Sequence, residues 1–159
     1  MALKQELELE LNRLAAVGGG GRLEVDLPHG RLTAEVLAVD AIGCSVYGVS
    51  FATPKLANVG VPQLKKISDE LTRRLTYLLE PIGLIETDQD SATVQMRSNP
   101  PQRDDDGTQY YELLVRRGGD LTLLRYQKVS GQPRQTIGAH LTREVFSRLA
   151  GDLTGVITP

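Results

Sequence analysis

The residues of this 159-residue sequence that could carry out chemistry are one cysteine, two histidines and several serines. Cys44 stands among hydrophobic residues, and no sequence neighbour supplies the base or positive charge that would stabilise a thiolate. His29 and His140 lack the spacing of a metal-binding pair. The serines lack the glycine-flanked pattern of a nucleophile elbow. We therefore predict no catalytic residue and expect that the protein is not an enzyme.

Acidic residues and glycines also gather at particular places in the sequence. Asp104, Asp105 and Asp106 offer the oxygen ligands that calcium prefers, but they lack the alternating spacing of an EF-hand, so a solvated turn explains them better. The four glycines of residues 18–21 lie between a helix and a strand, which is the wrong order for a phosphate-binding loop. They suit a flexible linker. We predict neither a metal nor a cofactor.

Basic residues supply a possible anion site near the C-terminus. Residues 109–159 carry a formal charge of plus 3, whereas the whole chain carries minus 2. Three tyrosines lie among these charges, and basic side chains with interleaved aromatic rings can hold phosphates and stack on bases. The same residues are also ordinary cross-strand partners on a solvated sheet. Nucleic-acid or other polyanion binding is thus an alternative function, with the candidate residues Arg116, Arg117, Arg125, Lys128 and Arg134.

Three helices are expected to position these groups. Residues 62–80 place apolar side chains at three- and four-residue steps, and Pro62 suits the first helical position. A helix over residues 2–16 precedes the glycines, and three arrangements are open to it: docking on its own domain, swapping to another copy or remaining mobile. A final helix over residues 142–153 begins with Thr142 as the capping residue. The central helix has the strongest pattern, formed by Leu64, Ile67, Leu71, Leu75 and Leu78.

The remaining segments alternate in the manner of strands. A three-stranded meander is expected in the first half, and two hairpins in the second; the predicted strands are residues 22–27, 32–39, 44–52, 84–88, 92–98, 109–117 and 121–129. The fold class is therefore α+β, with an antiparallel sheet of about six to seven strands in βββ-α-ββββ-α order. Two helices pack on this sheet and the N-terminal helix is extra. In element order alone the chain is similar to secretion-chaperone, TATA-box-binding-protein-like and helix-grip folds, and its strand count departs from the chaperone pattern.

Domain organisation and location follow from length and composition. We predict an N-terminal helix (residues 1–17), a glycine linker (18–21), a single α+β domain (22–153) and a tail (154–159). A single cysteine excludes an intrachain disulfide and favours a reducing compartment. The longest uncharged run, residues 41–54, is too short to span a bilayer, and the N-terminus is too acidic for a signal peptide. We expect a cytoplasmic protein without membrane contact.

The central strands suggest how the protein functions, because they read as apolar on both alternating faces. Two helices cover only one face, so the other needs the N-terminal helix, a second subunit or an apolar ligand. We therefore predict a non-catalytic interaction module, a homodimer that binds a protein segment through a sheet face or strand edge. The candidate contact residues are Tyr47, Val49 and Phe51. A protein with a small-molecule cavity between the sheet and the final helix is a further alternative.

Overall fold

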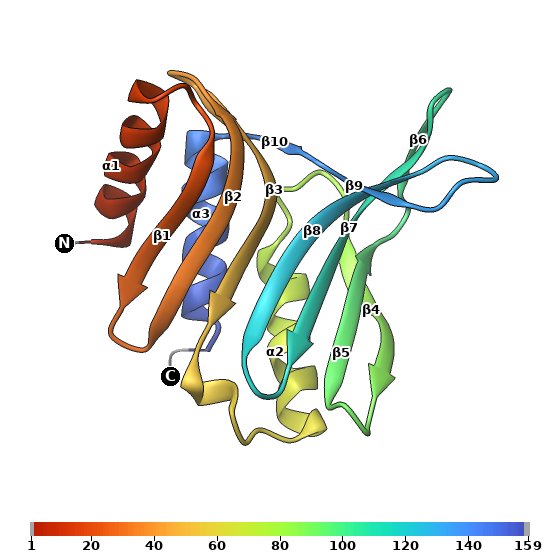
Figure 1. Cartoon of the computed structure of the whole chain (residues 1–159). Helices are drawn as coiled ribbons and strands as arrows, with labels where there is room; N and C mark the ends of the chain where they lie inside the picture. The colour runs from red at the N-terminus through yellow and green to blue at the C-terminus, as the bar shows by residue number, and fades with distance from the viewer. Residues whose placement is uncertain (1, 158–159) are drawn as a thin grey trace.

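The computed structural model describes residues 2–157 and has one antiparallel sheet with three α-helices (Figure 1). The predicted α+β class is confirmed. The helices are α1 (Leu3–Ala16), α2 (Val61–Arg74) and α3 (Arg143–Gly155), and a short 3-10 helix, η1 (Pro54–Leu56), precedes α2. The strands are β1 (Gly21–Leu27), β2 (Gly30–Val39), β3 (Gly43–Ala52), β4 (Ile82–Asp88), β5 (Thr93–Ser98), β6 (Gln102–Asp104), β7 (Gly107–Arg116), β8 (Asp120–Lys128), β9 (Gln135–Ile137) and β10 (Ala139–Thr142).

The sheet joins two meanders at its centre. Its main order is β1-β2-β3-β8-β7-β5-β4, so the last strand of the first meander pairs with the last long strand of the second. The short strands β6, β9 and β10 pair with β7, β8 and β3, respectively. These three were not predicted, because segments of three or four residues are too short to show a two-residue period.

All three helices lie on one face of the sheet, which we call the inner face (Figure 1). Helix α3 lies between the other two and contacts both. The long strands other than β4 turn alternate apolar residues toward this layer, and β4 contributes Ile82. These residues form one continuous core with the apolar sides of the helices. Among residues 2–157, no helix is both long and apolar enough to cross a membrane.

Helix α1 docks on its own chain. Its leucines at positions 7, 11 and 14 are buried in the common core against β1, β2 and α3. Polar contacts support the packing, because the Arg143 guanidinium donates to Glu8 at 3.2 Å and to Asn12 at 2.8 Å. Gly21 lets the chain turn tightly between α1 and β1. Its φ is +145°, and a Cβ at this position would lie 2.9 Å from Cδ2 of Leu14.

Two predicted helix ends differ from the structure. Helix α2 ends at Arg74, yet Leu75 and Leu78 remain buried in the following irregular segment, so the apolar period continues beyond the helix. Helix α3 begins as predicted, with the Thr142 hydroxyl accepting from the Val145 amide, but continues to Gly155. Thr154, expected in the tail, is buried, and its hydroxyl donates to a carbonyl one turn earlier.

The opposite face of the sheet, the outer face, differs from the expected apolar surface. No helix covers it within the described part of the chain (Figure 1). Polar pairs occupy its centre: the hydroxyls of Ser50 and Thr122 are hydrogen-bonded at 3.0 Å across β3 and β8. The surface that motivated the prediction of self-association is therefore of mixed polarity, and the homodimer stays a prediction.

The sheet forks between β3 and β8. The two strands pair only from Gly48 to Ala52 on β3, opposite residues 120–124 of β8. Beyond this point β3 pairs with β10 and β8 pairs with β9. The chain from β9 to β10 therefore bridges the opening of the fork (Figure 1).

Docking of α1 predicts a clear stability difference between two leucines of the same helix. Leu11 is 1% exposed and Leu9 is 55% exposed. We expect Leu11→Ala to lower the free energy of unfolding by about 2–5 kcal/mol, because it leaves a cavity in the core, and Leu9→Ala to change it by less than about 0.5 kcal/mol. Denaturant unfolding followed by circular dichroism measures both. Equal, small effects would show that α1 does not contribute to the core.

Candidate functional site: a polar pocket at the fork of the sheet

The three predicted partner-binding residues do not share a surface. Tyr47 is 43% exposed on the outer face, whereas Val49 and Phe51 lie in the core. The reason is a β-bulge: β2 pairs Glu35 with Gly48 but Val36 with Val46, so Tyr47 has no partner and the alternation shifts. Val49 and Phe51 therefore contribute to folding and present no side chain to a partner, and only Tyr47 keeps the predicted exposure.

The five predicted polyanion-binding residues are also separated. Arg116 pairs with Asp120 at 2.6 Å, next to the exposed Arg117 in the turn between β7 and β8. Arg125 lies on the inner face, and Lys128 binds the carbonyl of Gln132. Arg134 stacks 3.8 Å from the Tyr126 ring centre and pairs with Glu112, which is on the outer face. These cations therefore do not form one continuous basic surface.

The other residues considered above for chemistry are Cys44, the aspartates of residues 104–106 and the histidines. Burial raises the pKa of the Cys44 thiol to about 11, so the thiol is neutral at ordinary pH. Asp104 accepts a hydrogen bond from the Asp106 amide at 2.8 Å, which is typical of an exposed turn. The His29 ring packs edge-on against Phe51. Within residues 2–157, no group of three His, Cys, Asp or Glu side chains is arranged to hold a metal ion.

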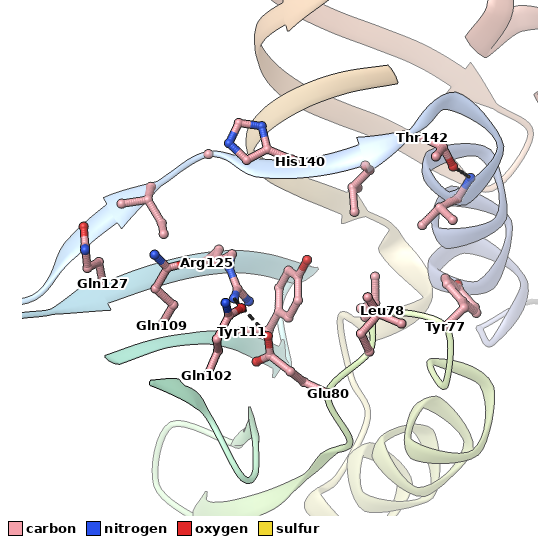
Figure 2. Close-up of a pocket in the computed structure, with 15 residues that line it drawn as sticks. Tyr77, Leu78, Glu80, Gln102, Gln109, Tyr111, Arg125, Gln127, His140 and Thr142 are labelled. Carbon is pink, nitrogen blue, oxygen red and sulfur yellow. Dashed lines mark hydrogen bonds and ion pairs between the residues drawn. The ribbon is translucent and has the colours of Figure 1, made fainter. Parts of the chain in front are cut away.

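A polar pocket of about 630 Å³ lies at the fork (Figure 2). The ends of β6, β7 and β8 form its base, the bridge from β9 to β10 closes one side, and the segment after α2 closes another. This volume is within the range of small-molecule sites. We call it the fork pocket; its polar lining consists of Tyr77, Glu80, Gln102, Gln109, Tyr111, Arg125, Gln127, His140 and Thr142.

The polarity of the inner face changes step by step along β7 and β8. Directly paired residues share a face, and the pair Leu113 and Leu123 lies in the core under the helices. Two residues further along is the pair of Tyr111 and Arg125, followed by Gln109 and Gln127. Gln102 of β6 is paired with Gln109, so three carboxamides form one row across three strands, the glutamine row. The inner face thus becomes a polar surface where the fork opens.

A buried ion pair lies beside the glutamine row. The Arg125 guanidinium donates to Glu80 at 2.9 Å, and the two side chains are only 8% and 11% exposed. Arg125 also donates to the Gln102 carboxamide at 3.3 Å and lies 4.4 Å from the centre of the Tyr111 ring (Figure 2). One nitrogen of Arg125, Nη1, and one oxygen of Glu80, Oε1, are buried without a hydrogen-bond partner. Buried charged atoms without partners are costly.

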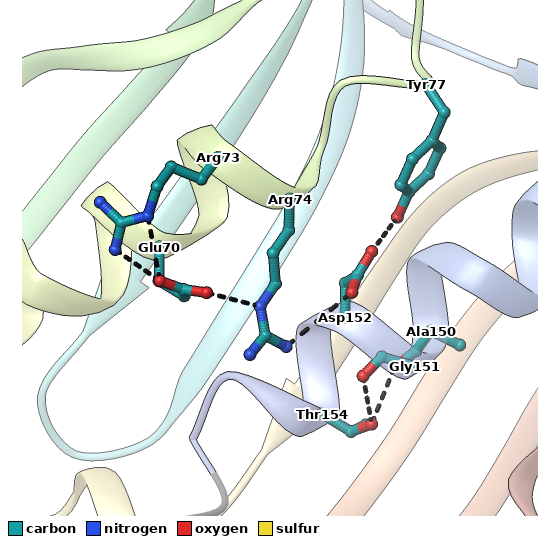
Figure 3. A network of polar contacts seen from close by, with 8 residues as sticks. All are labelled: Glu70, Arg73, Arg74, Tyr77, Ala150, Gly151, Asp152 and Thr154. Carbon is teal, nitrogen blue, oxygen red and sulfur yellow. Dashed lines mark hydrogen bonds and ion pairs between the residues drawn. The ribbon is translucent and has the colours of Figure 1, made fainter.

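A second polar network fastens the helical wall of the pocket (Figure 3). The Tyr77 hydroxyl donates to Asp152 of α3 at 2.6 Å, and the Arg148 guanidinium lies 4.2 Å from the Tyr77 ring centre. Arg74 extends the network from Asp152 to Glu70 within α2. Burial, followed by the hydrogen bond to Asp152, raises the pKa of Tyr77, which keeps the phenol protonated as a donor. The segment after α2 is therefore anchored to α3 just before Glu80.

The pocket offers recognition groups: three carboxamides, a guanidinium and carboxylate pair, and phenols. Of these residues, sequence reasoning identified only Arg125, and for a different role. A usable signal was present in residues 109–115 and 121–127, where every second residue changes from leucine or valine through Tyr111 and Arg125 to glutamine. Glu80 carried no such signal, because its place depends on the irregular chain after α2.

Comparison with known proteins gives no further guidance. The chain matches no protein-family model, and comparisons with curated proteins and with solved structures found no significant match.

Burial of the Arg125 and Glu80 pair predicts a characteristic pattern of stabilities. We expect Arg125→Met to lower the free energy of unfolding by about 3–5 kcal/mol, because Glu80 is left buried without its counter-ion, and the double variant with Glu80→Met to recover most of that loss. The control is Arg116→Met, whose pair with Asp120 is more exposed and is worth at most about 1 kcal/mol. Denaturant unfolding measures all three. If Arg125→Met lowered the free energy of unfolding by less than Arg116→Met does, the burial of the pair would be contradicted.

Proposed function

We propose that the protein is a non-catalytic binding module that holds a small polar organic molecule in the fork pocket. The observation that carries this proposal is the buried pair of Arg125 and Glu80, with one unpartnered atom on each residue, beside the glutamine row. A polar ligand in this pocket would meet hydrogen-bond donors and acceptors on three sides.

Structural requirements alone do not account for these residues. An inner-face leucine at position 125 would continue the pattern of Leu121 and Leu123 and would carry no desolvation cost. The chain instead places a charge there and a glutamine at the next inward position, next to open volume. A small number of polar groups that converge on a concave site is typical of ligand binding.

The glutamine row supplies the direct test. A thermal-shift screen with polyols, amides, amino acids and organic acids should find at least one stabilising compound. Calorimetry on Gln109→Ala should then show about fivefold or greater loss of affinity, the equivalent of one lost hydrogen bond. Gln5→Ala, on the exposed side of α1, is the matched control and should bind normally. A screen without hits, or affinity unchanged in Gln109→Ala, would contradict the proposal.

A second candidate function is self-association through the edge strand β4. Among the strands of residues 2–157, β4 pairs with β5 alone, and its side chains Leu84 and Ile85 are about half exposed. Ile85 has no partner in the register, which marks a local bulge. A free edge with exposed apolar residues can pair with the same strand of a second copy.

Light scattering after size-exclusion chromatography tests the edge. We expect a dimer for the wild-type chain and a monomer for Ile85→Lys, because a lysine at the edge opposes strand pairing. Val17→Lys provides a control, since Val17 is an exposed apolar residue far from β4 in sequence. A wild-type monomer at the highest soluble concentration would rule out this function.

A further inference from the structure

We infer that the ligand of the fork pocket carries a carboxylate that binds Arg125, and that Glu80 occupies this carboxylate position in the free protein. This inference rests on the proposed function and specifies its ligand class. Glu80 is then an internal competitor, and ligand binding exchanges one carboxylate for another on the same guanidinium.

The contact between Arg125 and Glu80 is poorly matched. A guanidinium and a carboxylate commonly pair through two parallel hydrogen bonds. Here Nη2 contacts Oε2, while Nη1 of Arg125 and Oε1 of Glu80 are both buried without partners. Both atoms are shielded from solvent and have no hydrogen-bond partner among the protein groups, an arrangement that is costly for charged groups. A mobile carboxylate, free to orient on the guanidinium, can satisfy Nη1 as well, and Glu80 can regain water when it leaves.

The backbone before Glu80 is strained. Leu79 has a φ of +69°, a left-handed conformation that is unfavourable for a residue with a side chain. Its side chain is 93% exposed, so no packing of Leu79 compensates for this conformation. On either side, Leu78 is buried in the core and Glu80 is held by Arg125. The ion pair therefore helps to hold the strained turn, and release of Glu80 would let the turn relax.

The groups around Arg125 define the rest of the ligand. The nearest row offers the carboxamides of Gln102, Gln109 and Gln127, which bind hydroxyl or amide groups. Arg125 is already fixed in place by the ring of Tyr111, so the guanidinium is oriented before the ligand arrives. The best fit is a small hydroxy acid or amino acid whose carboxylate meets Arg125 and whose polar substituents meet the glutamine row.

Lactate and lactamide, which differ mainly in charge, provide the test by NMR titration of the isotope-labelled chain. We expect wild-type protein to bind lactate and to shift the amide signals of Leu79 and Glu80. Glu80→Gln should bind lactate about tenfold tighter or more, because the internal competitor is gone and the binding-competent fraction rises. Its affinity for lactamide should rise much less than its affinity for lactate, because a neutral amide cannot replace a carboxylate on Arg125. Arg125→Gln should lose lactate binding.

Two further variants separate competition from general electrostatics and from loss of structure. Glu86→Gln removes an exposed negative charge from β4 nearby in sequence, and it should leave lactate affinity unchanged. Glu80→Asp keeps the charge but shortens its reach, so it should bind lactate more tightly than the wild type even if Glu80→Gln fails to fold.

The outcomes also distinguish this inference from the proposed function. Lactate affinity that is equal in the wild type, Glu80→Gln and Glu80→Asp would overturn the inference, as would lactate binding without a shift at Leu79. If lactamide or another neutral compound binds at the glutamine row and lactate does not, the pocket functions but the carboxylate assignment is wrong. If no compound in the panel binds at the pocket, both proposals fail.

Discussion

The register between β7 and β8 is the constraint on which the rest of this structure depends. It places leucine opposite leucine, tyrosine opposite arginine and glutamine opposite glutamine on the inner face. Because paired residues share a face, the two strands change from apolar to polar at the same level. A slip of one residue would turn Arg125 to the outer face and expose Leu121 and Leu123 of the same strand to solvent. The register therefore specifies both the burial of the core and the lining of the pocket.

The helices determine how much of that inner face is core. Helices α2 and α3 cover the apolar rows, and the chain after α2 crosses toward β4 carrying Tyr77 and Glu80. Tyr77 fixes this crossing to α3 through Asp152, and Glu80 fixes it to the sheet through Arg125. The fork between β3 and β8 leaves the polar rows uncovered by helix, and the bridge between β9 and β10 encloses them. Stability and recognition therefore rely on adjacent rows of the same strands.

Most of the regular structure could be predicted from the sequence because it arises from long periodic patterns. The apolar stripe of α2, the cap at Thr142 and the seven long strands are local properties. The bulge at Tyr47 could not be predicted, because it depends on pairing with β2 and not on the sequence of β3. It also separates Tyr47, which is exposed, from Val49 and Phe51, which lie in the core. The segment after α2 has the apolar spacing of a helix but is irregular. Leu75 and Leu78 are apolar because they fill the core, not because the chain is helical there.

The candidate site was less predictable than the fold. Its elements are far apart in sequence: Glu80, β6 to β8 and the bridge at residues 137–142 meet only through sheet topology. A buried arginine reads in sequence as a surface charge, and strand residues of alternating polarity read as an ordinary solvated face. The change from leucine to glutamine at every second residue of β7 and β8 hints that Tyr111 and Arg125 continue the inner face, but only the paired register places the two side by side.

Cross-strand nuclear Overhauser effects between β7 and β8 test the central claim most directly, because they report which residues are paired. The account predicts contacts that place Gln109 opposite Gln127, Tyr111 opposite Arg125 and Leu113 opposite Leu123. Contacts displaced by one residue, with Arg125 opposite Tyr110 or Glu112, would place the guanidinium on the outer face and contradict the account.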